Sequence, residues 1–142
     1  MFIFKRNPRK QMAYNVSYAG KTDVGKVRTN NEDAWLADDR LGLYVVADGM
    51  GGHECGEVAS AIAIETIFET VRGGGDLAQG IASAHREICR AADKGEGASG
   101  MGTTAVALQV INDTCVLGWV GDSRIYRFNQ RLEQVSLDHS YV

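Results

Sequence analysis

The sequence predicts an α+β fold in which helices gather on one face of an antiparallel sheet. Short strand-like apolar runs come first, two stretches with helical periodicity follow, and strand-like runs separated by tight turns return after residue 102. Strands and helices that are segregated along a chain favour α+β over an alternating α/β arrangement. The 142 residues correspond to one domain or to part of one.

The first part of the chain contains three predicted strands. Residues 13–18 roughly alternate between apolar and polar side chains, as a half-buried strand does, and residues 34–37 form a second short strand. Residues 41–47 are a denser apolar run, which suits a strand buried on both faces. Asp48 and Gly49 follow it directly, so an acidic residue is expected at the end of a buried strand.

Two helices are predicted in the middle of the chain. Residues 57–72 space their apolar side chains three and four apart, which forms a helix with a broad apolar face, and glycines 73–75 end it. Asp76 is a favourable N-cap residue for a second helix that runs to about Lys94. The glycine-rich segment 95–102 is then expected to be a loop.

The last part of the chain is predicted to form two antiparallel hairpins. Strands 103–111 and 114–120 flank Asn112-Asp113, two residue types that tolerate the left-handed backbone of a tight turn. Strands 123–128 and 132–135 flank a three-residue connection. Together they form an antiparallel meander after the helices.

Charge and composition exclude several functional classes. The net charge is −3, but four of the fifteen basic residues lie among the first ten, in a segment (residues 1–12) that we interpret as a flexible basic lead. The acidic remainder argues against nucleic-acid binding and could attract divalent cations. No apolar run approaches the ~18 residues of a membrane span. Three distant cysteines without a CxxC pair indicate reduced thiols in a cytoplasmic protein.

Polar residues concentrate near the ends of predicted strands. Asp48 and Asp122 each follow an apolar run, and residues 28–33 hold a guanidinium and two carboxylates. Each has an ordinary explanation: Asp48 could cap the next helix, Asp122 could belong to a turn or pair with Arg124, and residues 28–33 could form a solvated turn. A shared oxygen-rich site explains all three together, because carboxylates suit Mg²⁺ or Mn²⁺ and arginine suits a phosphate.

Other site chemistries fit the spacing poorly. A dinucleotide-binding GxGxxG motif starting at Gly49 would need a glycine where Glu54 stands, and no Gly-Lys-Ser/Thr triplet of a P-loop occurs. The Cys and His residues lack the spacing of zinc ligands. Cys55 lies two residues from His53, which is weak support for a cysteine nucleophile.

Five motifs, in order, resemble the bacterial type 2C metal-dependent Ser/Thr protein phosphatases. The similarity extends from about Gly20 to Ser140. The motifs are Arg28-x-x-Asn31-Glu32-Asp33, Val45-Val46-Ala47-Asp48-Gly49-Met50-Gly51-Gly52-His53, Gly102-Thr103-Thr104, Val120-Gly121-Asp122-Ser123-Arg124 and Asp138-His139-Ser140. No single motif is decisive, but their order and spacing together are specific. We interpret Gly102-Thr103-Thr104 as the start of a core strand beneath the site.

The resemblance implies a partial four-layer α-β-β-α sandwich of two antiparallel sheets flanked by helices. It also implies two bound Mn²⁺ or Mg²⁺ ions, and a third, more weakly bound ion that occurs in bacterial members. By this resemblance, Asp48 bridges both metals and Gly49 offers its carbonyl oxygen. Glu32 and Asp33 contact the second metal, partly through water, and Asp122 is a ligand of the third.

The activity implied by the resemblance is hydrolysis of phosphoserine and phosphothreonine in proteins, in opposition to a Ser/Thr kinase. A metal-bridged hydroxide would attack phosphorus directly while Arg28 binds the phosphate, so no nucleophilic side chain is needed. Met50 stands where some eukaryotic members have a histidine that acts as general acid. We do not transfer that role to His53, which we interpret as a structural histidine.

Residues 13–142 are expected to correspond to the N-terminal part of such a domain. The family's later Ser-Asp-Gly and Asp-Asn motifs, whose aspartates complete the metal pair, do not occur in the sequence. We therefore expect this chain alone to be inactive, and to expose sheet edges and one apolar face. It could be a fragment, a truncated gene product or half of a split enzyme. The alternatives are a non-catalytic phosphoprotein-binding module that retains Arg28, and an unrelated metal-binding domain.

Overall fold

The fold is α+β, as the sequence predicts. The computed structural model describes residues 16–52, 55–97 and 99–139. The elements are β1 (Asp33–Asp38), β2 (Leu43–Met50), α1 (Cys55–Arg72), α2 (Leu77–Asp93), β3 (Gly102–Thr103), β4 (Ala105–Ile111), β5 (Thr114–Val120), β6 (Tyr126–Asn129) and β7 (Arg131–Gln134). Strands β1, β2, β4 and β5 form the larger antiparallel sheet in that order, β3 pairs with the end of β2, and β6 and β7 form a separate two-stranded sheet.

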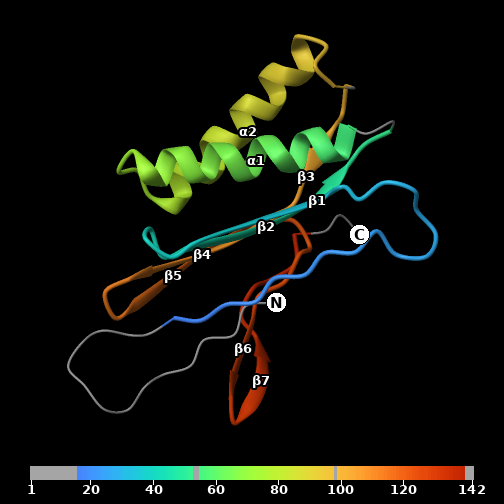
Figure 1. The fold of residues 1–142 in the computed structure, drawn as a ribbon. Helices are drawn as coiled ribbons and strands as arrows, with labels where there is room; N and C mark the ends of the chain where they lie inside the picture. Colours follow the sequence, from blue (N-terminus) through green and yellow to red (C-terminus); the bar gives the residue numbers. More distant parts are fainter. Residues whose placement is uncertain (1–15, 53–54, 98, 140–142) are drawn as a thin grey trace.

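Both helices cover the same face of the larger sheet, and the β6–β7 hairpin projects on the opposite side (Figure 1). The segment before β1 runs along that opposite face, where the ring of Tyr18 lies 5.6 Å from that of Tyr44. We call this surface, which points away from α1 and α2, the far face of the sheet. No helix within the described ranges is long and apolar enough to cross a membrane.

The core lies between the larger sheet and the two helices. Strand β2 is central, with Leu43, Val45 and Ala47 fully buried, and each fully buried Leu or Val side chain contributes roughly 1.5–3 kcal/mol. Residues on neighbouring strands that stand opposite one another share a face, so Leu36, opposite Val45, packs toward the helices, while Trp35, opposite Val46, lies on the far face. The alternation therefore assigns one face to the core.

Helix α2 begins with the capping predicted from Asp76. The Asp76 carboxylate accepts a hydrogen bond from the Gln79 amide (2.8 Å), and the Gln79 side chain accepts one from the Asp76 amide (3.0 Å). Each contact satisfies a backbone donor that has no partner within the helix. Helix α1 ends at Arg72 as expected, but begins at Cys55, two residues earlier than predicted.

The structure corrects several strand boundaries. Residues 16–18, the described part of the strand predicted at 13–18, form no strand, because Tyr18 packs on the far face instead of pairing with a neighbouring strand. The strand predicted at 103–111 is interrupted at Thr104. The strand predicted from residue 123 begins only at Tyr126, and its hairpin forms the separate small sheet rather than extending the meander. The predicted lead, residues 1–12, lies outside the described residues.

Large apolar side chains are exposed on the far face and on the small sheet. Trp35 on the far face is 39% exposed, and Phe128 and Leu132 on the small sheet are 73% and 66% exposed. This confirms the expected exposure of apolar surface. Scattered exposed apolar residues are ordinary, but several on one hairpin mark a surface that a neighbouring element could cover.

Replacing the cap of α2 should measurably destabilise the fold. We expect Asp76→Ala to lower the free energy of unfolding by about 1 kcal/mol, because the Gln79 amide loses its acceptor. Urea unfolding monitored by circular dichroism would measure this. Asp93→Ala removes an exposed acid at the other end of α2 and serves as the control. Equal stability of Asp76→Ala and Asp93→Ala would contradict a capping contribution.

Candidate metal and phosphate site

The candidate site centres on Asp48, which stands directly opposite Asp33 in the β1–β2 register. Partial burial raises the pKa of Asp48 above its ordinary value, and the negative charges of Asp33 and Asp122 and a hydrogen bond with Asp33 raise it further. The nearby charge of Arg28 lowers it. The structure therefore brings together charged residues from all three segments that the sequence singled out.

The sequence predicts Asp48 directly after its strand, but the structure places it within β2. Strand β2 continues to Met50 because Gly49 and Met50 pair with β3. Asp48 and Asp33 therefore share the far face of the sheet, where like charges opposite one another are unfavourable. A cation between these carboxylates would offset that repulsion.

Glu32 joins three parts of the site. Its carboxylate forms an ion pair of 2.9 Å with Arg28, whose side chain remains 70% exposed while that of Glu32 is only 13% exposed. Its backbone carbonyl accepts a hydrogen bond of 3.1 Å from the amide of Gly49. The side chain also lies against Gly56 in the first turn of α1, where the helix dipole favours a negative charge. Glu32 is thus fixed to both β2 and α1.

The end of β2 meets the start of α1 through glycines. A Cβ atom on Gly49 would lie 1.9 Å from the carbonyl oxygen of Gly56, and one on Gly56 would lie 2.7 Å from the carboxyl carbon of Glu32. Neither position has room for a side chain. Sequence reasoning did not identify Gly56. The available signal was a glycine at the second position of a helix, where it is otherwise unfavourable.

Thr104, which is predicted from the sequence to lie in a core strand beneath the site, contacts the site residues directly. Its hydroxyl accepts a hydrogen bond from the Asp48 amide (3.1 Å), and its own amide donates to the Asp48 carbonyl (2.9 Å). The same hydroxyl lies 2.6 Å from that of Ser123, the residue after Asp122. Thr104 lies at the break between β3 and β4, and its hydrogen bonds connect β2 at Asp48 to the turn that carries Asp122.

Arg124 resolves one alternative left open by the sequence. It pairs with Asp138 at 2.7 Å rather than with Asp122. Asp122 itself is exposed and is close enough to Asp48 to affect its pKa. The turn therefore places the Asp122 carboxylate near Asp48, whereas the Arg124 guanidinium forms an ion pair with Asp138, away from Asp122 in the sequence.

The donor set fits part of a cation site. Carboxylate oxygens suit Mg²⁺ and Mn²⁺, and burial together with the negative charges of Asp33 and Asp122 disfavours the unpartnered charge of Asp48. Among the described residues, however, no three His, Cys, Asp or Glu side chains converge closely enough to enclose a metal ion. Further ligands would have to be water or other residues. The predicted role of the Gly49 carbonyl remains a prediction, and His53 lies outside the described residues.

Filling the space at Gly56 should destabilise the chain. Alanine normally favours a helix over glycine, but the added Cβ of Gly56→Ala would overlap the Glu32 carboxyl group. We expect a net loss of about 1–3 kcal/mol in the free energy of unfolding. Thermal and urea unfolding would measure it, with Gly52→Ala as the control because a Cβ there meets nothing within 4 Å. An increase in the free energy of unfolding would show that there is room for a Cβ between residue 56 and the Glu32 carboxyl group.

Removing the Asp48 charge should stabilise the metal-free chain at neutral pH. A raised pKa means that the folded chain holds the Asp48 proton more tightly than the unfolded chain does. Stability therefore falls as pH rises from the ordinary pKa through the folded value. Asp48→Asn should raise the melting temperature at pH 7 by about 2–4 °C in EDTA. The difference should shrink as the pH is lowered toward 3.8.

Melting curves in EDTA across this pH range, read by circular dichroism, would test the Asp48 prediction. Asp113→Asn, in the exposed β4–β5 turn, is the matched control for removing one carboxylate. An equal stabilisation by Asp113→Asn would indicate a general effect of net charge. A melting temperature of Asp48→Asn that is unchanged at pH 7 would contradict repulsion at the site.

The sequence matches known phosphatases over most of its length. The family model described as "Protein phosphatase 2C" matches residues 25–141. The serine/threonine protein phosphatase PstP of Mycobacterium tuberculosis is 37% identical over 132 residues, which is 88% of this chain and 25% of the relative. The serine/threonine phosphatase Stp of Listeria monocytogenes is 35% identical over 136 residues, which is 86% of this chain and 54% of the relative.

Solved structures agree with this fold. A crystal structure of the M. tuberculosis phosphatase PstP superposes with a TM-score of 0.79 at 34% identity, covering 88% of this chain and 55% of that one. A structure of the PstP catalytic domain in complex with two manganese ions gives the same TM-score and covers 56% of that chain. The chain thus spans about half of the solved phosphatase domains that it resembles. Its motifs, fold and relatives together show that the chain belongs to the protein phosphatase 2C family.

Proposed function

We propose that this chain forms the part of a Ser/Thr protein phosphatase domain that carries Asp48 and the phosphate-binding Arg28. The observation that carries the proposal is that Asp33 and Asp122 lie near enough to Asp48 to raise its pKa, while the nearby charge of Arg28 lowers it. Carboxylates whose negative charge raises the pKa of Asp48 in this way would favour binding of a divalent cation. An arginine beside them could hold an oxyanion such as a phosphate.

The proposed metal ligands follow from the placement of each residue. Asp48 is central and would contact both ions, while Asp33 stands opposite it. Glu32 lies one residue before Asp33 and would act partly through water. Asp122 would serve a third ion, and Gly49 would offer its carbonyl. A divalent cation bound there lowers the pKa of a coordinated water so that hydroxide is available near neutral pH.

Arg28 is suited to bind the substrate phosphate. Its ion pair with Glu32 uses Nη1, which leaves Nη2 and Nε on an exposed guanidinium to donate to phosphate oxygens. Glu32 would hold the guanidinium in place before the substrate arrives. During the reaction, the positive charge of Arg28 would offset the charge on the equatorial oxygens of the transferring group.

The comparisons support the substrate class and the cofactor in general terms. The matching relatives are named serine/threonine phosphatases, and one similar structure contains two manganese ions. We therefore propose phosphoserine and phosphothreonine in proteins as substrates, Mn²⁺ or Mg²⁺ as cofactor, and a Ser/Thr kinase as the opposing enzyme. Because the chain spans only a quarter to about half of the length of these relatives, these statements concern the complete domain.

Metal binding by the chain and its Asp48→Asn variant would test this function. We expect wild type to bind Mn²⁺ in an electron paramagnetic resonance titration, and Asp48→Asn to bind it at least tenfold more weakly, by analogy with the loss of one ligand. Asp113→Asn should bind like wild type. Equal Mn²⁺ affinity of wild type and Asp48→Asn would refute the proposed centre.

Hydrolysis of p-nitrophenyl phosphate in Mn²⁺ would then test the expected inactivity of the isolated chain. We expect no turnover, because the described residues do not gather three metal-binding side chains. Metal-dependent turnover that Asp48→Asn abolishes would show that the centre is completed in some other way, for example by a second copy. That result would support the function and contradict the expected inactivity.

A non-catalytic phosphoprotein-binding module is the second candidate. The exposed guanidinium of Arg28 favours it. It predicts that a phosphoserine peptide binds in EDTA and that Arg28→Lys, which loses the planar donor fork, binds more weakly. Peptide binding that requires Mn²⁺ would favour the phosphatase.

A further inference from the structure

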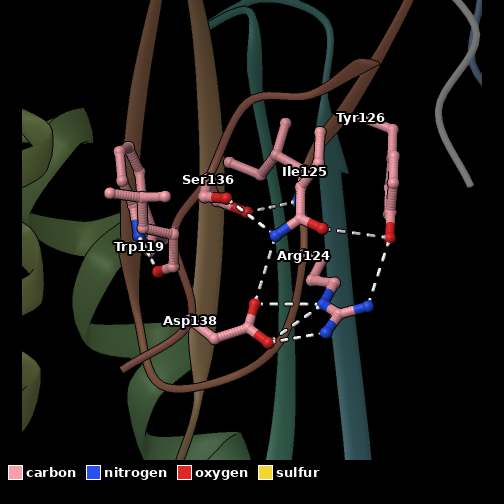
Figure 2. A network of polar contacts seen from close by, with 8 residues as sticks. Trp119, Arg124, Ile125, Tyr126, Ser136 and Asp138 are labelled. Carbon is pink, nitrogen blue, oxygen red and sulfur yellow. Dashed lines mark hydrogen bonds and ion pairs between the residues drawn. The ribbon is translucent and has the colours of Figure 1, made fainter. Parts of the chain in front are cut away.

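A short segment after β7 crosses the turn that carries Asp122. We call residues Val135–His139 the strap and residues Gly121–Ile125 the site turn. The Val135 amide donates to the Ile125 carbonyl at 2.8 Å, and the Ile125 amide donates to the Ser136 hydroxyl at 2.8 Å. Ser136 is almost fully buried. Figure 2 shows this contact beside the larger network.

The far end of the strap is fastened to β5 and to the start of the site turn. The Trp119 indole donates to the Leu137 carbonyl at 2.9 Å, and the Trp119 and His139 rings stack with centroids 6.3 Å apart. The His139 amide donates to the carbonyl of Gly121 at 2.9 Å. The strap therefore contacts the residue immediately before Asp122.

Arg124 and Asp138 join the strap to the site turn by side chains. The guanidinium Nε lies 3.0 and 3.1 Å from the two Asp138 oxygens, and Nη2 lies 2.7 Å from one of them (Figure 2). The planar fork of Arg124 thus grips both carboxylate oxygens. Hydrogen bonds from Arg124 hold the pKa of Asp138 below its ordinary value. Gln134 also donates to Asp138 at 3.2 Å.

This ion pair is exposed, so it should contribute little to overall stability. The side chains of Arg124 and Asp138 are 49% and 26% exposed, and water and salt screen the attraction within exposed ion pairs. Its geometry is nonetheless restrictive, because two-point contact fixes orientation as well as distance. The pair is better suited to setting the position of the site turn than to holding the fold together.

Asp122 stands between two tethered neighbours. Gly121 adopts a φ of 97°, accepts the strap's hydrogen bond, and leaves no room for a Cβ because Thr104 Cγ2 would lie 2.7 Å away. Ser123 lies 2.6 Å from the Thr104 hydroxyl, which also contacts the Asp48 backbone. The site turn is held from one side by Thr104 and from the other by the strap.

We propose that Arg124 is a positioning residue that, through Asp138 and the strap, fixes the Asp122 carboxylate for cation binding near Asp48. This proposal rests on the proposed metal-dependent function. In this role Arg124 acts through other residues. Its effect on the site would pass through Asp138 and the strap to Gly121, and also along the backbone through Ser123 to Asp122.

Four variants in Mn²⁺ titrations would test the role of Arg124. We expect Arg124→Gln to weaken the Asp122-dependent part of Mn²⁺ binding about tenfold, the lower end of the effect of groups that orient metal ligands. Arg124→Lys should be intermediate, because it keeps the charge but loses the fork. In the Asp122→Asn background, Arg124→Gln should cause no further loss, because the residue that it positions is already absent.

Arg127→Gln is the matched control. Like Arg124, Arg127 forms an ion pair with an acidic residue, in this case Glu133 on the neighbouring strand β7. Arg127 itself lies on β6, and among the contacts of the described residues none joins it to the strap. Its removal should leave Mn²⁺ affinity unchanged. Amide exchange in EDTA gives a metal-independent readout: the His139 amide and Trp119 indole protons should exchange faster in Arg124→Gln than in Arg127→Gln.

The outcomes separate the positioning role from the function on which it rests. Wild-type Mn²⁺ binding together with an unchanged affinity in Arg124→Gln would overturn the positioning role alone. So would an equal loss from Arg124→Gln in the wild-type and Asp122→Asn backgrounds, which indicates a general structural effect. If Arg124→Gln fails to fold, Arg124→Lys in the same two backgrounds decides the matter in the same way. Absence of Mn²⁺ binding in wild type would overturn both proposals.

Discussion

The contact of backbone with backbone at Gly49 and Gly56 sets how the larger sheet meets α1. With no side chain at either position, the end of β2 approaches the first turn of the helix closely. The same approach places Glu32 between the Gly49 amide and the helix start. The position of Glu32 in turn determines where its ion-pair partner Arg28 stands. The packing of two glycines thus determines the arrangement of charged groups.

The fold places several negative charges close together at the candidate site, although they repel one another. Asp33 and Asp48 face one another across two strands, and Asp122 adds a third charge nearby. The structure offsets this only in part, through Arg28 and through the dipole of α1 near Glu32. Such local conflict with stability is common where a site is built for a ligand, since the ligand itself relieves it.

Local patterns predicted the elements and motifs of this chain better than its long-range contacts. Periodicity located both helices, and residue type located the cap at Asp76 and the hairpin at Asn112, whose φ is 55°. The motifs identified charged residues that do meet at one end of the sheet. The predicted strand at 13–18 was wrong in its described part, because alternation also arises when a segment packs flat against a sheet.

The contacts that sequence reasoning missed join residues that are far apart in the chain. Thr104 contacts Asp48, which is 56 positions away, and Arg124 pairs with Asp138, which is 14 positions away. Neither partner can be read from spacing, because each depends on how strands and turns are stacked in space. Arg124 illustrates the difficulty, since Asp122 is the nearer acid in sequence and Asp138 is the one that it binds.

The register of β1 against β2 has a consequence for how this site tolerates change. Shifting β1 by one residue would turn Asp33 toward the helices and would exchange Leu36 for Trp35 in the core. The apolar alternation that forms the core therefore also keeps the two carboxylates aligned. Selection on burial at Leu36 or Val45 would preserve the charged pair without acting on it directly. A core substitution that permits slippage would disable the site while leaving every charged residue in the sequence intact.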